Sequence, residues 1–246
     1  MTDISNVVVG LGETGSPLFS ILKRGFDDSV GIDPAVGVSL DDCGSIGSAR
    51  FLHICIPGDL PEFRDILNEY SERFSPQATI IHSTVPVGTT SSLDVGEVFH
   101  SPINGKHADM EASLSRHIKF IGGIPGSYSL NDIIEMFDVC GVELCYAGKS
   151  EVTELGKTLS TTLYGYLIAW EQEVEHICAE FDLDRDEVRQ LWCKIDSTDW
   201  DPKVKTPGFI GGHCVMPNID ILLSQLDSEM LDWIKSSNKR YIENAD

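Results

Sequence analysis

Residues Asn6–Leu22 read NVVVGLGETGSPLFSIL. A short apolar strand leads into Gly10, Gly12 and Gly15, spaced as G-x-G-x-x-G, and then into a helix with apolar periodicity, which is the setting of a dinucleotide-binding fingerprint. Gly10 permits a tight turn, Gly12 lets the backbone approach a pyrophosphate, and Gly15 lets the helix pack closely on the sheet. Amide groups at the start of that helix are expected to bind the phosphates.

A second predicted strand, Ser29–Asp33, ends in an acid at about the spacing expected for a ribose contact. We expect Asp33 to accept a hydrogen bond from the ribose 2′-hydroxyl. Because an acid repels a 2′-phosphate and no arginine follows closely, the pattern favours NAD over NADP. Glu13 and Thr14, between the glycines, are included among the predicted cofactor contacts. The alternative interpretation is a glycine-rich turn that binds no ligand.

Composition narrows the classes of protein and partner. The 246 residues carry a formal net charge of −21, which disfavours binding to nucleic acid or to an anionic membrane. The sequence shows neither an export signal nor an apolar run long enough to span a bilayer, so we expect a soluble, cytoplasmic protein. The seven cysteines are scattered and odd in number, which predicts reduced thiols, and they form no recognisable metal-ligand set.

Further short apolar segments alternate with helical patterns up to residue 148. Together they predict an α/β fold, a Rossmann-like, doubly wound, mainly parallel sheet. The predicted strands are Phe51–Pro57, Ala78–Val85, Val98–Pro102, Ile118–Gly122 and Glu143–Tyr146, and the predicted helices are Pro61–Phe74 and Ser129–Val139. Residues 34–48 are expected to be loop with at most one short helix.

Three more candidate cofactor contacts follow from the predicted strand ends. Pro57 terminates one strand, and Ser83 and Thr84 end the next. Ligands of open α/β sheets bind at the carboxyl edge, where these residues are placed. The alternative for the two hydroxyl residues is that they only cap the following helix.

From residue 149 the pattern becomes helical, which predicts a second domain at 149–246. Val152–Phe181 reads as one long helix with apolar residues every three or four positions, and we expect a homodimer through it. Burial of this helix inside the chain is the alternative. A further helix is predicted at Leu183–Lys194, with Asp184 as its N-cap and Glu187 completing a capping box. Helical periodicity then resumes at Ile219–Ile234.

Between those helices lies Thr206–Asn218, TPGFIGGHCVMPN, whose glycines and prolines predict a sharp turn. Cys214 is placed at or just beyond the turn, close to a helix N-terminus and next to His213. That setting lowers a thiol pKa and makes the thiol nucleophilic. A buried structural cysteine is the alternative.

Four motifs in this order resemble the UDP-glucose/GDP-mannose dehydrogenase family, over most of the chain. VVVGLGETGSPL resembles the family's opening V-G-L-G-Y-V-G-L-P, and STVPVGTT at Ser83–Thr90 resembles its S-T-V-P-P-G-T-T. ELGK at Glu154–Lys157 resembles the start of its central helix. PGFIGGHC at Pro207–Cys214 resembles its P-G-x-G-G-H-C turn, with Ile210 as an insertion or shift. The resemblance implies oxidation of the C6 alcohol of a nucleotide sugar to a carboxylate with two NAD.

By the same resemblance, Cys214 is the nucleophile that forms a thioester, and Lys157 stabilises the developing oxyanion. A solvated lysine is the alternative for Lys157. Thr161 stands where the family has a helix asparagine, and Asn218 stands where it has an aspartate, so both catalytic positions depart from the pattern. The loop glutamates of the family are replaced by SPINGKH at residues 101–107, and its C-terminal nucleotide-sugar domain has no counterpart in this sequence.

Two hypotheses of different class follow. In the first, the protein is an NAD-dependent dehydrogenase of a sugar or polyol, with His107 or His213 as a possible base. In the second, it binds NAD or a nucleotide without oxidising anything and serves as a subunit in glycan biosynthesis. The retained Cys214 and Lys157 favour the enzyme, whereas Asn218 and Thr161 favour the binding subunit.

Overall fold

The structure is a computed structural model that describes residues 2–105, 109–124, 129–195 and 205–244, without the side chains of residues 192–195. Contacts divide the chain into two compact units, Met1–Lys157 and Thr158–Asp246. The division falls inside the long helix, nine residues beyond the expected boundary at 148. Each unit is described separately below.

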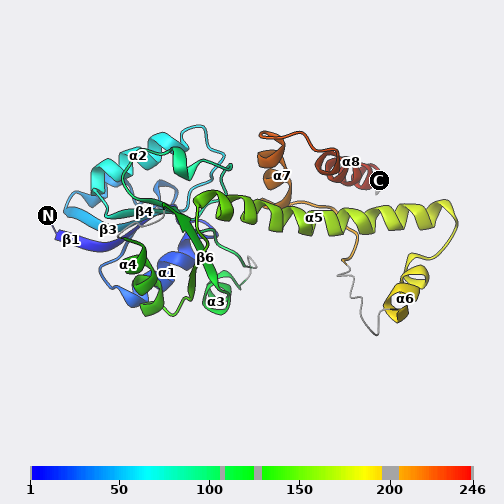
Figure 1. The fold of residues 1–246 in the computed structure, drawn as a ribbon, viewed down its shortest axis with the longest axis horizontal. Helices are drawn as coiled ribbons and strands as arrows, with labels where there is room; N and C mark the ends of the chain where they lie inside the picture. Colours follow the sequence, from blue (N-terminus) through cyan, green and yellow to red (C-terminus); the bar gives the residue numbers. More distant parts are fainter. Residues whose placement is uncertain (1, 106–108, 125–128, 196–204, 245–246) are drawn as a thin grey trace. The chain divides into compact units, whose positions relative to one another are not determined.

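The first unit is built on a seven-stranded sheet (Figure 1). The strand order is β2-β1-β3-β4-β5-β6-β7; every neighbouring pair is parallel except β5 and β6, which are antiparallel. The strands are β1 (Thr2–Val9), β2 (Val30–Ile32), β3 (Ile46–Ile54), β4 (Ala78–Ile81), β5 (Val98–His100), β6 (Lys119–Gly123) and β7 (Leu144–Tyr146). The predicted Rossmann-like, mainly parallel sheet is confirmed.

Helices cover both faces of this sheet, with α2 on one face and α1 and α4 on the other (Figure 1). In β1, Val8 packs into the core under α1, and Val7 and Val9 pack into the core under α2, as expected for a strand buried on both sides. The helices and short 3-10 turns of this unit are α1 (Gly15–Gly25), η1 (Pro34–Val36), η2 (Leu40–Cys43), α2 (Phe63–Phe74), η3 (Thr90–Ser92), α3 (Met110–Arg116) and α4 (Ser129–Val139).

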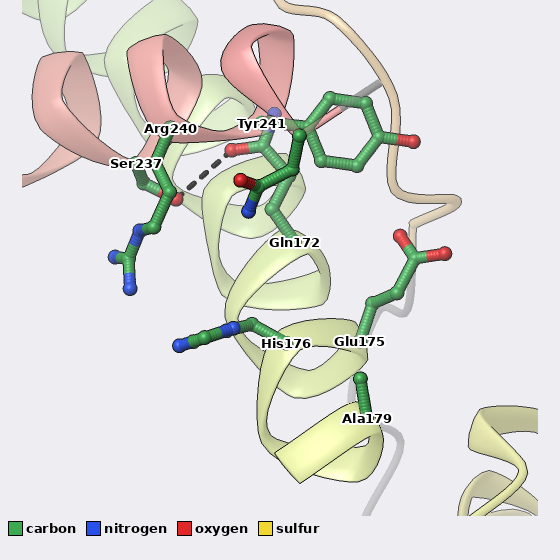
Figure 2. Close-up of a pocket in the computed structure, with 8 residues that line it drawn as sticks. Gln172, Glu175, His176, Ala179, Ser237, Arg240 and Tyr241 are labelled. Atoms are coloured by element: carbon green, nitrogen blue, oxygen red, sulfur yellow. Dashed lines mark hydrogen bonds between the residues drawn. The ribbon is translucent and has the colours of Figure 1, made fainter. Parts of the chain in front are cut away.

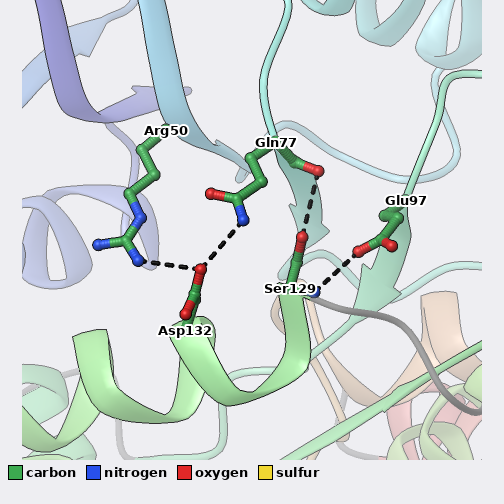
Figure 3. Close-up of polar contacts among 5 residues, drawn as sticks. All are labelled: Arg50, Gln77, Glu97, Ser129 and Asp132. Carbon is green, nitrogen blue, oxygen red and sulfur yellow. Dashed lines mark hydrogen bonds and ion pairs between the residues drawn. The ribbon is translucent and has the colours of Figure 1, made fainter.

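Polar contacts fix the start of α4 against the sheet (Figure 3). Asp132 pairs with Arg50 of β3 at 3.0 Å and accepts a hydrogen bond from Gln77 at 3.0 Å. The backbone N–H of Ser129 donates to Glu97 at 3.1 Å, and its hydroxyl donates to the carbonyl of Gln77. These partners come from β3 and from residues next to β4 and β5, so the contacts set where α4 lies on its face of the sheet.

Several elements of this unit differ from the predictions. The strand predicted over Ala78–Val85 ends at Ile81. Strand β3 begins at Ile46, five residues early, because its first part pairs with the start of β1 even though Gly47, Ser48 and Arg50 interrupt the apolar run. Helix α2 begins at Phe63, so Pro61 precedes it. Two 3-10 turns occupy residues 34–43, and α3 has no predicted counterpart.

The long helix α5 (Ser150–Glu180) matches its prediction within two residues at each end. Its first two turns belong to the first unit and the remainder to the second. Helix α6 (Arg185–Ile195) follows, and its predicted N-cap is confirmed, since the Asp184 carboxylate accepts the backbone N–H of Glu187 at 2.9 Å. The second unit is completed by α7 (Val215–Leu223) and α8 (Glu229–Glu243).

The single helix predicted over Ile219–Ile234 is wrong. The structure has two helices there, separated by residues 224–228, and Ser228 caps the second through its hydroxyl. Ile219 and Ile234 both lie in the core of the second unit, so apolar periodicity persisted across the break. The first of these helices starts at Val215, four residues early, since the first turn of a helix accepts a proline such as Pro217.

The described residues contain neither a membrane-spanning helix nor a cluster of metal-ligating side chains. In this part of the chain, no helix is both long and apolar enough to cross a bilayer. The same residues contain no group of three or more histidine, cysteine or acidic side chains placed to hold a metal ion.

Candidate functional site

The three fingerprint glycines have distinct backbone geometries and surroundings. Gly10 has φ +87°, and a Cβ there would lie 2.9 Å from the Cys55 carbonyl. A Cβ on Gly15 would lie 1.8 Å from the Gly10 oxygen, so α1 starts directly on the preceding turn. A Cβ on Gly12 would meet nothing within 4 Å. Gly10 and Gly15 are therefore required by the fold, whereas the space beside Gly12 is open to a ligand.

The start of α1 is suited to an anion. Thr14 is the N-cap residue and makes no side-chain capping bond, and the first turn contains no acidic residue. The partial positive charge at a helix N-terminus is therefore not neutralised by an acid in that turn. Glu13, just before it, is exposed.

Asp33 lies beside this loop, at the carboxyl end of β2. One carboxylate oxygen accepts the backbone N–H of Leu11 at 2.8 Å, and the other accepts that of Ala35 at 2.8 Å. Asp33 therefore connects the glycine loop to the turn after β2. A carboxylate has about four lone-pair sites, so capacity for a ribose hydroxyl remains.

The loops after β3 and β4 are in contact at the same carboxyl edge. The Ser83 hydroxyl donates to the Ile56 carbonyl next to Pro57, and a Cβ on Gly58 would lie 2.2 Å from the Thr84 oxygen. The alternative that Ser83 and Thr84 cap a following helix is wrong, because the next helical turn, η3, begins only at Thr90. The structure thus brings these candidate contacts to one edge of the sheet.

The first turns of α5 hold the loop after β4 through two buried side chains. Glu154 has no exposed surface, and its two carboxylate oxygens accept the backbone N–H groups of Gly88 and Thr90 at 2.7 and 2.9 Å. The imidazole of His100 lies 2.8 Å from the Thr153 hydroxyl and 3.1 Å from the Ser83 carbonyl oxygen. No local sequence pattern predicted a role for Glu154 or His100.

Lys157 is bound by the loop after β5. Its ammonium donates to the Ile103 carbonyl at 2.8 Å and to the Asn104 side chain at 3.1 Å. The half-buried ammonium is therefore held at a defined place by these two bonds. Thr161 lies one turn further along the same helix and is half-buried.

In the second unit, the glycine-rich turn is held from two helices. The Asn238 side chain accepts the Ile210 N–H at 2.8 Å and donates to the Ile210 carbonyl at 3.0 Å, while Gln172 donates to the Gly208 carbonyl at 2.7 Å. Ile210 is buried in the core of this unit. The residue that differs from the family motif therefore anchors the turn.

Cys214 is the N-cap residue of α7 and half-buried, as its prediction near a helix N-terminus requires. Asn218 lies one turn further and is buried, and His213 is exposed. Gly165 of α5 lies under this helix, since a Cβ there would be 2.4 Å from a Val215 methyl. His107 lies outside the described residues.

A separate hollow of about 320 Å³ lies between α5 and α8 in the second unit (Figure 2). Figure 2 shows His176 and Arg240 pointing to one side, and Glu175 and Tyr241 to the other. None of the predicted site residues lines it. We assign it no part in the site.

Burial shifts the pKa values of several side chains below the carboxyl edge of the sheet. It lowers the pKa of His53 and of His100 to about 3 each, lowers that of Lys119 to about 7, and raises that of the Cys55 thiol to about 12. These four residues lie in short apolar segments of the sequence, and no motif there predicts a function for them.

The sheet, the glycine loop and the helical unit that follows define a fold that solved dehydrogenases share. A structure of UDP-D-ManNAc dehydrogenase from Pyrococcus horikoshii matches 98% of this chain and 70% of its own, with 18% identity and a TM-score of 0.81. UDP-glucose dehydrogenase from Pyrobaculum islandicum matches 96% of this chain and 68% of its own, with 13% identity and a TM-score of 0.72.

A third similar structure, 3-hydroxyisobutyrate dehydrogenase from Mycobacterium tuberculosis with L-serine, matches 100% of this chain and 94% of its own, at 13% identity and a TM-score of 0.68. No protein-family profile and no curated protein sequence matches the chain. The likeness is therefore one of fold.

Proposed function

We propose that the protein is an NAD-dependent dehydrogenase that oxidises an alcohol of a sugar, a nucleotide sugar or a related small molecule. The observation that carries the proposal is the glycine loop. Gly15 is indispensable to the fold, whereas Gly12 faces open space next to Asp33 and the start of α1. Similar solved structures are dehydrogenases of UDP sugars and of a 3-hydroxy acid.

The residues present fit a dinucleotide. The backbone at Gly12 and the start of α1 are suited to the pyrophosphate, and Asp33 is suited to the adenosine ribose. Ser83 and Thr84 follow β4 at the same carboxyl edge of the sheet and are further candidate contacts. When bound, NAD supplies a hydride acceptor. An acid at position 33 favours NAD over NADP because it repels a 2′-phosphate.

The catalytic roles are proposed from the family resemblance and from the chemistry of the side chains. Lys157 supplies a positive charge held at a defined place, which suits the stabilisation of a developing oxyanion. Cys214 is proposed as the nucleophile, and Thr161 and Asn218 are the other two candidate catalytic residues. A homodimer through α5 remains part of the proposal, because Leu155, Leu159 and Leu163 on that helix are exposed.

The reaction stoichiometry tests these roles. With a substrate that is oxidised fully to a carboxylate, wild type is expected to form two NADH per substrate. Cys214→Ser is expected to stop after the first hydride transfer, at one NADH per substrate, because the hydroxyl is a weak nucleophile without a base. Equal stoichiometry in both proteins would exclude Cys214 as the nucleophile.

The second candidate is a subunit that binds the dinucleotide without oxidation. The observation that favours it is Asn218, which is 4% exposed and cannot act as a base at the position where the family has an aspartate. NAD binding without turnover of any panel compound would favour this candidate.

A further inference from the structure

A row of buried polar side chains crosses the sheet on the face covered by α4. It runs from Ser29, just before β2, through Asn6 of β1, His53 of β3 and His82 after β4 to Lys119 of β6, and none is more than 4% exposed. Burial of so many polar groups is costly unless each is hydrogen-bonded. The cofactor site proposed above uses none of them.

Strand register shows where the row leads. Asn6 pairs with Phe51, so His53 lies two residues further toward the carboxyl ends of the strands. His53 pairs with Ile80, and His82 lies two residues further again. The row therefore climbs diagonally from the middle of the sheet to its carboxyl edge, where the candidate site lies.

Proton positions in the row follow from its last acceptor. His82 Nδ1 is 2.7 Å from the carbonyl oxygen of Ser101, and a carbonyl can only accept, so Nδ1 carries the His82 proton. His82 Nε2 must then accept from His53 Nδ1, 3.0 Å away. Both rings are neutral, since burial lowers the pKa of each well below its usual value.

The same assignment of donors and acceptors fixes the orientation of the Asn6 amide. His53 Nε2 has no proton left, yet the amide oxygen of Asn6 faces it at 3.1 Å, and the amide nitrogen faces Ser29 Oγ at 3.1 Å. Rotating the amide by 180° lets its NH₂ group donate to His53 and its oxygen accept the Ser29 hydroxyl. Every donor then points toward Ser101, and the bonds polarise one another in the same direction.

The segment that receives the row also binds Lys157. The Lys119 ammonium donates to the carbonyls of Ser101 and Pro102 at 2.5 and 3.1 Å. The next two residues, Ile103 and Asn104, bind the Lys157 ammonium at 2.8 and 3.1 Å. Two lysines and one imidazole therefore hold four consecutive residues.

We propose that Lys119 and the His53–His82 pair are positioning residues, which hold segment 101–104 in the place where it binds Lys157. The role of Lys157 in chemistry rests on the proposed function, but the positioning itself does not. A readout that needs no substrate therefore separates a failure of this proposal from a failure of the dehydrogenase assignment.

The first test measures histidine tautomers by nitrogen-15 NMR of the wild-type protein near neutral pH. His53 and His82 are expected to be neutral with the proton on Nδ1, the less common tautomer of a free imidazole. His53→Phe and His82→Phe assign the signals, and His117→Phe, at an exposed position, serves as the control. A proton on Nε2 in either ring, or an imidazolium, would overturn the proton positions derived for the His53–His82 pair and the positioning role assigned to it.

The second test measures how fast an amine-reactive reagent labels Lys157, by mass spectrometry. Lys119→Met is expected to raise the rate about three- to tenfold, because the displaced segment then gives up one of its hydrogen bonds to Lys157. Lys239→Met, the same substitution at an exposed site of α8, is expected to leave the rate unchanged. Equal rates in wild type and Lys119→Met would overturn the positioning role, and the tautomer measurement stands even if that variant does not fold.

Discussion

Replacing Gly12 and Gly15 separately by alanine distinguishes ligand approach from folding. The two residues lie in the same loop and receive the same methyl group. A Cβ on Gly15 would lie 1.8 Å from the Gly10 oxygen, whereas a Cβ on Gly12 would meet nothing within 4 Å. Each variant thus isolates one of the roles assigned to the fingerprint.

The expected magnitudes differ accordingly. In Gly15→Ala, α1 must retreat from the preceding turn by about 1.2 Å, from 1.8 Å to the 3.0 Å below which such contacts essentially never occur. We expect a loss of about 3 kcal/mol or more in the free energy of unfolding, at the upper end of overpacking effects. In Gly12→Ala, stability is expected to stay within about 0.5 kcal/mol of wild type.

For Gly12→Ala the change appears in binding. The methyl group occupies the space through which a pyrophosphate approaches the backbone, so one hydrogen bond to a charged group is lost, worth about 1.5–3 kcal/mol. The Kd for NAD is expected to rise about ten- to 150-fold.

Calorimetric titration measures the affinity and chemical denaturation the stability of both variants. Wild-type affinity in Gly12→Ala would refute the assignment of this loop to the pyrophosphate. Wild-type stability in Gly15→Ala would refute the packing argument.

Three further predictions concern other parts of the chain. Asp33→Ala is expected to weaken NAD binding in calorimetry by about tenfold or more, the effect of losing a hydrogen bond to a charged group, and unchanged affinity would exclude the ribose contact. Asn238→Ala leaves the buried backbone groups of Ile210 unpaired and is expected to lower the free energy of unfolding by about 1–3 kcal/mol for each group; a denaturation midpoint equal to that of Lys239→Ala would contradict this. The pKa of His53 falls from 6.5 to about 3 on folding, so below pH 6.5 the unfolded state binds a proton that the folded state does not, and stability falls as the pH is lowered. Between pH 6.5 and about 5, His53→Phe is expected to reduce that slope by up to about 1.4 kcal/mol per pH unit, and an unchanged slope in denaturation curves would show that the ring is not buried neutral.

Local signals were sufficient for much of the fold. The strand, turn and helix around the glycines, the positions of the strands and the Asp184 cap each depend on neighbours within a few residues, and each of these is observed. The break between α7 and α8 was missed because residues on both sides face the same core, which preserves the apolar periodicity. The early start of β3 depends on pairing with β1, which no local pattern reveals.

The candidate site was predictable only in part, because some of its residues depend on partners that are distant in the sequence. The glycines are close in sequence to the turn they form, and Asp33 was found from the spacing of the fingerprint, although it bonds to Leu11, 22 residues earlier in the chain. Lys157, in contrast, gains its environment from residues more than fifty positions earlier in the chain. The partners of Glu154 and of the buried histidines likewise come from distant strands and loops, so their roles required the strand register.

NADH formation by the wild-type protein tests the central claim most directly. The panel comprises nucleotide sugars, free sugars and short 3-hydroxy acids, each supplied with NAD and followed by absorbance. The dehydrogenase proposal predicts NADH formation with at least one of these classes, and a much lower rate with NADP in place of NAD. Binding of NAD with no oxidation of any compound in the panel would contradict it.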